Sequence, residues 1–170
     1  MSKLKVLTYP HSTLRIKSEP VTKFDKNLEK LLDDMVETMY AQEGIGLAAV
    51  QVGKPICAIV LDVSQKNQTE PGLIKLINPE ILETAEKTTY NEGCLSVPDI
   101  NEIVTRHKKI KIKAQDEKGK ECIIDADGLF SICIQHELDH LNGILFIDKL
   151  SRLKRELLKN KLKKLEKGTT

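Results

Sequence analysis

The segment LFSICIQHELDHLNG, residues 129–143, constrains the fold of this chain more than any other stretch of its sequence. Its apolar residues occur at helical spacing on more than one side, which is typical of a helix that other elements cover. Gly143 is the expected C-cap, because glycine readily adopts the left-handed backbone that ends a helix. The rest of the chain must therefore supply the surfaces that bury this helix.

Strands are expected to supply most of that cover. Residues 102–128 alternate apolar and polar side chains around the turn DEKGK, which predicts an antiparallel β-hairpin. The apolar run at residues 56–63 predicts a buried strand, and the glycine-punctuated residues 43–55 before it predict a loop. Proline and glycine interrupt residues 72–98, so we expect short strands and turns there.

Amphipathic helices are expected near both ends of the chain. Residues 25–42 predict one helix with Asp25 as its N-cap, and residues 151–168 predict a basic helix that begins at Ser151 and stops at Gly168. One face of this second helix carries five leucines: Leu153, Leu157, Leu158, Leu162 and Leu165. Helices at both ends with local antiparallel strands between them indicate an α+β fold, in which antiparallel β-sheets pack around the central helix.

Length and composition exclude several classes of protein. With 170 residues and 40% hydrophobic composition, the chain predicts one folded domain, residues 1–170, and not a disordered protein. No apolar run approaches the roughly 20 residues of a membrane span, and the N-terminus lacks a signal-peptide core, so we expect a cytoplasmic protein without membrane association. Residues 151–170 hold eight Lys or Arg and two Asp or Glu, so a basic tail follows a slightly acidic body.

Two histidines on the central helix, His136 and His140, are four residues apart. Positions i and i+4 of an α-helix point nearly the same way, so both imidazoles can bind one metal ion. Glu137 can reach a metal-bound water without being a ligand, which is the HExxH arrangement. The alternative is an ordinary helix with two hydrogen-bonded histidines. Burial of the helix favours the metal, because two buried imidazoles need partners.

A catalytic metal site of this kind usually has a third protein ligand and an open position. No histidine follows His140, and the acids downstream are Asp148, Glu156 and Glu166. Upstream, Cys94 lies in the segment NEGCLSVP, which predicts a turn. A thiolate with two imidazoles suits a borderline divalent metal, and these ligand types alone also allow zinc. Cys94 is therefore the candidate third ligand.

Three segments resemble the peptide deformylase family in their order and spacing: GIGLAAVQ (44–51), EGCLS (92–96) and QHELDH (135–140). The resemblance extends over nearly the whole chain. It implies that Cys94, His136 and His140 bind Fe(2+), with Zn, Ni or Co able to occupy the same site. It also implies a metal-dependent hydrolase that removes the N-formyl group from the formyl-methionine of newly synthesised proteins and releases formate.

The resemblance implies a role for individual residues around the metal. Metal-bound hydroxide would attack the formyl carbon, with Glu137 as general acid and base. The side-chain amide of Gln51 and the backbone N–H of Leu95 would stabilise the oxyanion. Glu92 and Arg106 would form a pair that braces the cysteine turn. The methionine pocket would be lined by Ile45, Gly46, Tyr90, Leu129, Ile132, Cys133 and His136.

Two positions depart from the pattern of the family. Val50 replaces the Pro or Thr that often precedes the glutamine, which is a mild change. Asn101 stands where some members have an arginine that contacts the substrate, which leaves open how substrate affinity is affected. The residues that the chemistry requires are all present.

The basic tail and the metal motif also allow other interpretations. The tail is either a solvated helix docked by its leucines or a contact with the ribosome, whose RNA attracts Lys and Arg. The protein itself is expected to be a monomer. A zinc endopeptidase would use the same HExxH motif, but it predicts a third ligand distal to the helix and not Cys94. A non-enzymatic RNA-binding protein with a structural metal would normally offer four protein ligands, whereas this chain offers three.

Overall fold

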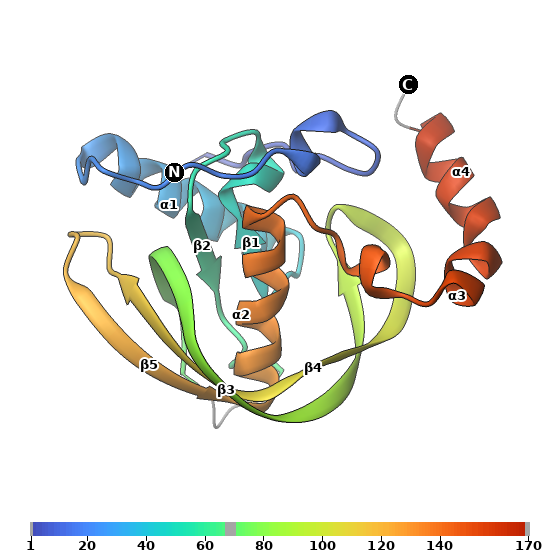
Figure 1. Cartoon of the computed structure of the whole chain (residues 1–170). Coiled ribbons are helices and arrows are strands. Elements are labelled where there is room, and N and C mark those ends of the chain that lie inside the picture. The colour runs from blue at the N-terminus through green and yellow to red at the C-terminus, as the bar shows by residue number, and fades with distance from the viewer. Residues whose placement is uncertain (1, 67–70, 169–170) are drawn as a thin grey trace.

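The structure is a computed structural model that describes residues 2–66 and 71–168. Figure 1 shows helix α2 in the middle of the molecule, with the sheet curving around it and the C-terminal helices to one side. Along the chain the elements are η1 (Ser12–Arg15), α1 (Lys26–Ala41), β1 (Gly46–Ala48), η2 (Ala49–Val52), β2 (Ala58–Leu61), β3 (Ile74–Cys94), β4 (Val97–Gln115), β5 (Glu121–Asp127), α2 (Gly128–Leu141), η3 (Phe146–Lys149), α3 (Arg152–Leu157) and α4 (Lys159–Gly168).

The described strands form one sheet in the order β1-β2-β3-β4-β5, and every neighbouring pair is antiparallel. The prediction of a mixed fold of helices and antiparallel strands is confirmed, although the strands belong to one continuous sheet and not to several. None of the helices in the described ranges is long and apolar enough to cross a membrane.

Strand β2 is apolar at every position because helices cover both of its faces. One face, with Ile59 and Leu61, joins a cluster that includes Phe130 and Ile134 of α2. The opposite face, with Ala58 and Val60, joins a second cluster formed mainly with α1: Leu28, Leu32, Met35 and Met39. Alternate side chains of a strand point to opposite faces, so a strand between two helices needs apolar residues throughout.

The prediction of several short strands over residues 72–98 is wrong, although a turn is present there at Leu95 and Ser96. Strand β3 runs for 21 residues without a break, although its pairing with β4 shifts register near Pro79, near Leu82 and near Gly93. Within β3, only Ile74–Ile77 pair with β2. Pro79 therefore lies just beyond the part of β3 that has a neighbouring strand on both sides. A proline there costs no hydrogen bond to β2, which is why the strand continues through it.

Most of the other local predictions are confirmed, with small changes at the boundaries. β4 and β5 form the predicted hairpin, and the Asp25 side chain accepts the Leu28 N–H at the start of α1. Helix α2 has Asn142 as its C-cap, one residue before the predicted position, and Gly143 follows with a φ of 73°. The predicted loop before β2 contains the short strand β1 and the 3-10 helix η2, and η2 carries Gln51.

The prediction of one C-terminal helix over residues 151–168 is wrong. Ser151 caps α3 as expected, but the helix breaks at Leu158 before α4 begins. On a continuous helix, Leu153 and Leu157 would point roughly 80–180° away from the other three leucines, so one surface could not bury all five. The break lets Leu158 pack at 8% exposure, while Leu157 stays 75% exposed. Leu162 and Leu165 pack partly beside Leu158.

This difference between neighbouring leucines predicts a difference in docking energy. Leu158→Ala should lower the free energy of local opening of α3 and α4 by about 2 kcal/mol, because it removes a buried side chain. Leu157→Ala, the matched control, should change it by less than about 0.5 kcal/mol. Native-state hydrogen exchange of residues 152–168 measures both, and equal effects would contradict the packing described above.

Candidate metal centre and active site

Helix α2 and the end of strand β3 bring three metal-ligand atoms together. His136 and His140 lie one turn apart on α2, and their Nε2 atoms are 3.3 Å from each other. The Sγ atom of Cys94 lies 3.3 Å from Nε2 of His140, and all three donor atoms lie within 4.8 Å of one another. The structure thus places together the three residues that the sequence selected.

These residues fit a divalent metal ion. In a tetrahedral site with bonds of about 2.0–2.3 Å, neighbouring donor atoms are separated by roughly 3.3–3.7 Å. The two 3.3 Å separations around His140 match that spacing. One sulfur and two imidazole nitrogens suit iron, zinc and their first-row neighbours, and three protein donors leave a position for water or substrate.

A tight turn fixes the position of the cysteine. Cys94 is the last residue of β3 and pairs with Val97, the first residue of β4, so Leu95 and Ser96 form a two-residue turn. The thiol, the backbone N–H of Leu95 and the Ser96 hydroxyl therefore come from three consecutive residues. The strand pairing on each side holds this turn against α2.

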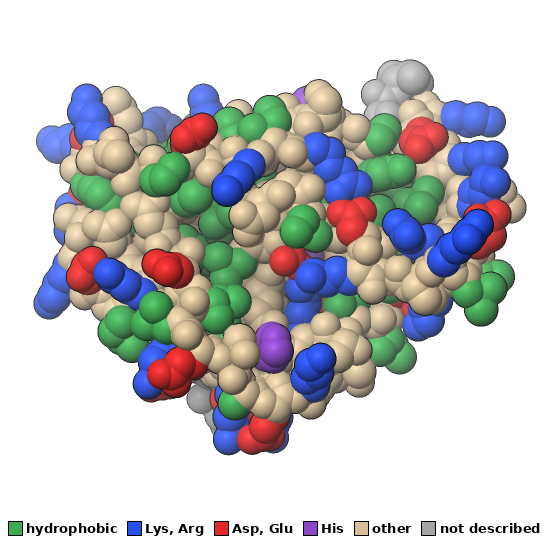
Figure 2. Space-filling model, viewed as in Figure 1, with side chains coloured by type: hydrophobic (Ala, Val, Ile, Leu, Met, Phe, Trp, Pro, Cys, Tyr) green, Lys and Arg blue, Asp and Glu red, His purple; other side chains and the backbone are tan. Residues whose placement is uncertain are grey.

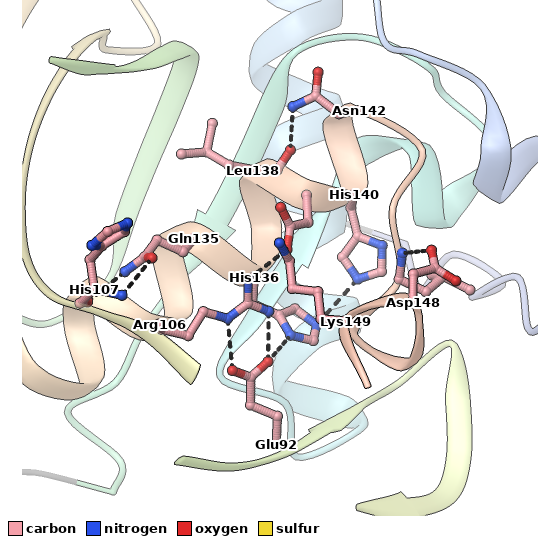
Figure 3. Close-up of polar contacts among 12 residues, drawn as sticks. Glu92, Arg106, His107, Gln135, His136, Leu138, His140, Asn142, Asp148 and Lys149 are labelled. Atoms are coloured by element: carbon pink, nitrogen blue, oxygen red, sulfur yellow. Dashed lines mark hydrogen bonds and ion pairs between the residues drawn. The ribbon is translucent and has the colours of Figure 1, made fainter. Parts of the chain in front are cut away.

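A buried ion-pair network supports the first histidine (Figure 3). Arg106 donates two hydrogen bonds of 2.8 Å to Glu92, and it also contacts Asp139 of α2 at 2.5 Å. An oxygen of Glu92 lies 2.9 Å from Nδ1 of His136. Burial by itself would raise the pKa of Glu92, but the hydrogen bonds with Arg106 and His136 outweigh it and lower the pKa to about 2. Such a contact fixes which ring nitrogen of His136 faces the metal.

The Glu137 carboxyl group lies in the same buried space but lacks comparable partners. Its Oε2 atom is buried and makes no hydrogen bond with the described residues. Burial raises the pKa of Glu137 to about 7, against the opposing effects of His136 and Arg106. A Cβ atom at position 46 would lie 2.6 Å from Oε1 of Glu137 and 2.9 Å from Sγ of Cys133, so any larger residue there would displace these side chains. A carboxyl with such a pKa can both accept and release a proton near neutral pH.

Gln51 reaches the site from the 3-10 helix η2. Its side chain is almost fully buried, and its Oε1 atom accepts a hydrogen bond of 2.9 Å from the N–H of Ala48. Its Nε2 atom donates to Oγ of Ser96 at 3.0 Å and to Sγ of Cys94 at 3.7 Å. The amide N–H groups of Gln51 thus point toward the metal-ligand atoms.

A cavity of about 290 Å³ opens beside these groups. All seven residues predicted for the methionine pocket line it: Ile45, Gly46, Tyr90, Leu129, Ile132, Cys133 and His136. Asn101 also lines the cavity, and its side-chain oxygen lies directly over Gly93. The apolar part of the cavity ends at Glu137, Gln51 and Cys94, which are the chemically active groups.

Sequence reasoning missed several residues of the site. Val97 and Ile100 also line the cavity, but an apolar alternation in β4 does not reveal which residues face it. Asp139 lies three residues after His136, so helical spacing could have indicated that it shares that side of α2. Ser96 carried no such signal, because its contact with Gln51 joins two segments that are 45 residues apart.

The fold and the donor atoms together define a class: an α+β protein with a three-donor site on an HExxH helix, as metal-dependent hydrolases have. A family model described as polypeptide deformylase matches residues 3–156. A peptide deformylase of Wolinella succinogenes is 47% identical over 168 residues, covering 98% of this chain and 99% of the relative.

Solved structures give the same result. The crystal structure of a peptide deformylase from Legionella pneumophila has a TM-score of 0.89 and 40% identity, covering 99% of this chain and 98% of that one. The peptide deformylase of Ehrlichia chaffeensis, in complex with actinonin, has a TM-score of 0.89 and 43% identity, covering 96% and 98%. The chain belongs to the peptide deformylase family, whose members are metal-dependent hydrolases that remove the formyl group from nascent peptides.

Two cysteines of the site should respond differently to mutation. Cys94→Ala should lose most of the bound metal, because it removes one of three donors. Cys133→Ala should keep it, because Cys133 faces the carbonyl of Ile45 and lies in the cavity wall. Metal content per chain after gel filtration, measured by mass spectrometry, tests both. Metal loss in both variants, with both still folded, would contradict this ligand set.

Proposed function

We propose that this protein hydrolyses the N-formyl group of formyl-methionyl nascent peptides, with Cys94, His136 and His140 holding Fe(2+). The observation that carries the proposal is the position of Glu137. Its carboxyl is buried, its pKa is raised to about 7, and one oxygen lacks a partner among the described residues. It adjoins a three-donor set, an arrangement suited to moving a proton beside a metal.

In the proposed reaction the water and the carbonyl group would be activated by the metal, and Glu137 would transfer the proton. A bound divalent metal lowers the pKa of water and polarises a carbonyl group. Glu137 accepts the proton of the attacking water and delivers it to the leaving amine. Formate and a free methionine N-terminus result. Zn, Ni or Co in the same donor set would supply the same kind of chemistry.

The oxyanion would be stabilised by Gln51 and by the backbone of the cysteine turn. The Nε2 atom of Gln51 lies 3.7 Å from Sγ of Cys94, so its N–H reaches the space in front of the metal ligands. The N–H of Leu95 follows Cys94 directly in the turn. Fixed donors aimed at a developing negative charge typically contribute about 3–4 kcal/mol each to the transition state.

The cavity would bind the methionine side chain. Its predicted lining is mainly apolar, with Ile45, Leu129 and Ile132 around the thiol of Cys133. Burial raises the pKa of that thiol well above its ordinary value, so it stays protonated and behaves as a small apolar wall. A flexible thioether side chain fits such a surface without a specific hydrogen bond.

The setting of the reaction is part of the proposal. We propose that residues 1–170 act as a single domain, as a monomer, in the cytoplasm, where nascent chains are formylated. Figure 2 shows Lys and Arg side chains gathered over the side of the molecule where α3 and α4 lie. That surface would contact ribosomal RNA close to the emerging substrate.

Glu137→Ala should abolish formate release while the metal stays bound. The expected loss in kcat is at least about 100-fold, because a positioned acid and base contributes roughly 100- to 10,000-fold. The assay uses anaerobically purified protein with Fe(2+) and a formyl-methionyl tripeptide. Binding of actinonin and metal content in the variant serve as controls for an intact site.

The same experiment separates the alternative functions. Unchanged formate release in Glu137→Ala, or loss of its metal, would refute the role of Glu137. Cleavage of internal peptide bonds without formate release by the unmodified protein would identify an endopeptidase. A folded protein that binds metal but does neither would support a non-enzymatic RNA-binding protein.

Ribosome contact has its own test. Lys161→Glu with Lys164→Glu reverses two exposed charges on α4 and should weaken co-sedimentation with ribosomes, most strongly at low salt. Lys17→Glu with Lys54→Glu is the matched control, because it makes the same charge change at exposed positions outside α3 and α4. Equal binding by both double variants would refute the contact, and formate release from a short peptide should be unaffected by either.

A further inference from the structure

We infer that Ser96 is a positioning residue, which holds the carboxamide of Gln51 so that one of its N–H groups faces the formyl oxygen of the substrate. The inference rests on the proposed function and assigns a role to a side chain that the sequence did not select. Three contacts carry it: those of Gln51 with Ala48, with Ser96 and with Cys94.

The first contact decides which end of the amide faces the metal site. A backbone N–H can only donate a hydrogen bond, and the N–H of Ala48 lies 2.9 Å from the amide of Gln51. The oxygen Oε1 must therefore face Ala48, and the nitrogen Nε2 must face the cysteine turn. If the amide were reversed, two donors would meet in a fully buried place, which is costly.

The second contact restrains the nitrogen. Oγ of Ser96 accepts one N–H of Gln51 at 3.0 Å, and Ser96 is fully buried. A primary amide has two N–H groups, so one remains. It is directed toward Sγ of Cys94, 3.7 Å from the nitrogen, and both residues line the cavity that would bind the substrate. Ser96 thus accepts one N–H of Gln51 and thereby fixes the direction of the other.

The two segments are themselves held in register by the N-terminal segment. The N–H of Leu7 donates to the carbonyl of Gln51, and the N–H of Tyr9 donates to the carbonyl of Ser96, each at 2.7 Å. One extended stretch of backbone thus links 3-10 helix η2 with the turn between β3 and β4. The side-chain contact between Gln51 and Ser96 lies between two backbones that are already fixed.

Such restraint matters because donors stabilise an oxyanion best when they need not reorganise during the reaction. A glutamine side chain has three rotatable bonds, and ordering such a long side chain costs conformational entropy. Because Ser96 and Ala48 hold the Gln51 side chain in the folded protein, this entropy is lost during folding and not when the transition state forms. Loss of the Ser96 hydroxyl should therefore lower kcat more than it changes KM.

A double-mutant cycle on formate release tests the inference. Gln51→Ala should lower kcat about 100- to 1,000-fold, as removal of an oxyanion donor does. Ser96→Ala should lower kcat about 10-fold with KM within about twofold, since it loosens the donor and does not remove it. In the Gln51→Ala background, Ser96→Ala should have no further effect, because nothing is left to position.

Ser131→Ala is the matched control. Ser131 is also fully buried, and its Oγ accepts a hydrogen bond of 3.0 Å from another glutamine, Gln135, outside the cavity. The Ser131 hydroxyl also donates a hydrogen bond of 2.9 Å to the carbonyl of His107, so this variant should lose at least as much thermal stability as Ser96→Ala but keep its kcat. Ser96→Gly removes the same hydroxyl and provides the test if the alanine variant does not fold.

A measurement without turnover completes the test. In ¹⁵N-labelled protein, the side-chain amide of Gln51 should give a heteronuclear NOE typical of a rigid group, and Ser96→Ala should lower it. The inference is overturned if this amide stays rigid, or if Ser96→Ala costs the same with and without Gln51. The proposed function fails separately: then the unmodified protein releases no formate, or Gln51→Ala leaves kcat unchanged.

Discussion

The buried pair of Glu92 and Arg106 connects the sheet to the helix that carries the chemistry. Arg106 belongs to β4 and Glu92 to β3, and together they reach Asp139 and His136 on α2. Burying such charges is unfavourable unless each one is paired and hydrogen-bonded, and here each of the three guanidinium nitrogens donates to a carboxylate. The pair therefore orients the strands, the helix and the first histidine with respect to one another, and a change in any of them disturbs the others.

The neighbouring Glu137 shows the opposite arrangement a few ångströms away. Glu92 keeps its charge because two partners compensate its burial, and its pKa falls to about 2. Among the described residues Glu137 has no comparable partner, and its pKa rises to about 7. Two glutamates in one buried region are thus suited to different tasks, one to hold a histidine and one to move a proton. The packing of the rest of the core, which includes β2 and its two covering helices, offsets the unfavourable burial of the Glu137 carboxyl.

The backbone around the site is as important as its side chains. The turn after β3 presents a thiol, a backbone N–H and a hydroxyl from Cys94, Leu95 and Ser96, and the N-terminal segment ties this turn to Gln51. Helical spacing and the family resemblance carried by three short motifs were enough to select the three residues that the fold brings together, Glu137 beside them and seven of the residues that line the cavity. The same reasoning missed the length of β3. A proline ends a strand only where a neighbouring strand needs a hydrogen bond from that position, and β2 does not pair with Pro79. The same reasoning also missed the break at Leu158, because a pattern of leucines does not show which surface will receive them.

The sequence by itself determined the local elements and the donor types: a helix with histidines four residues apart, capped helices at both ends, and a hairpin around DEKGK. These follow from short-range periodicity, capping and turn chemistry, which depend on residues close together in the chain. Only the tertiary structure decided which distant groups meet. The contacts of Cys94 with His140, of Arg106 with Asp139 and of Gln51 with Ser96 each join residues more than 30 positions apart. Their distances depend on how the strands pair and on where the helix packs, and no local pattern specifies either.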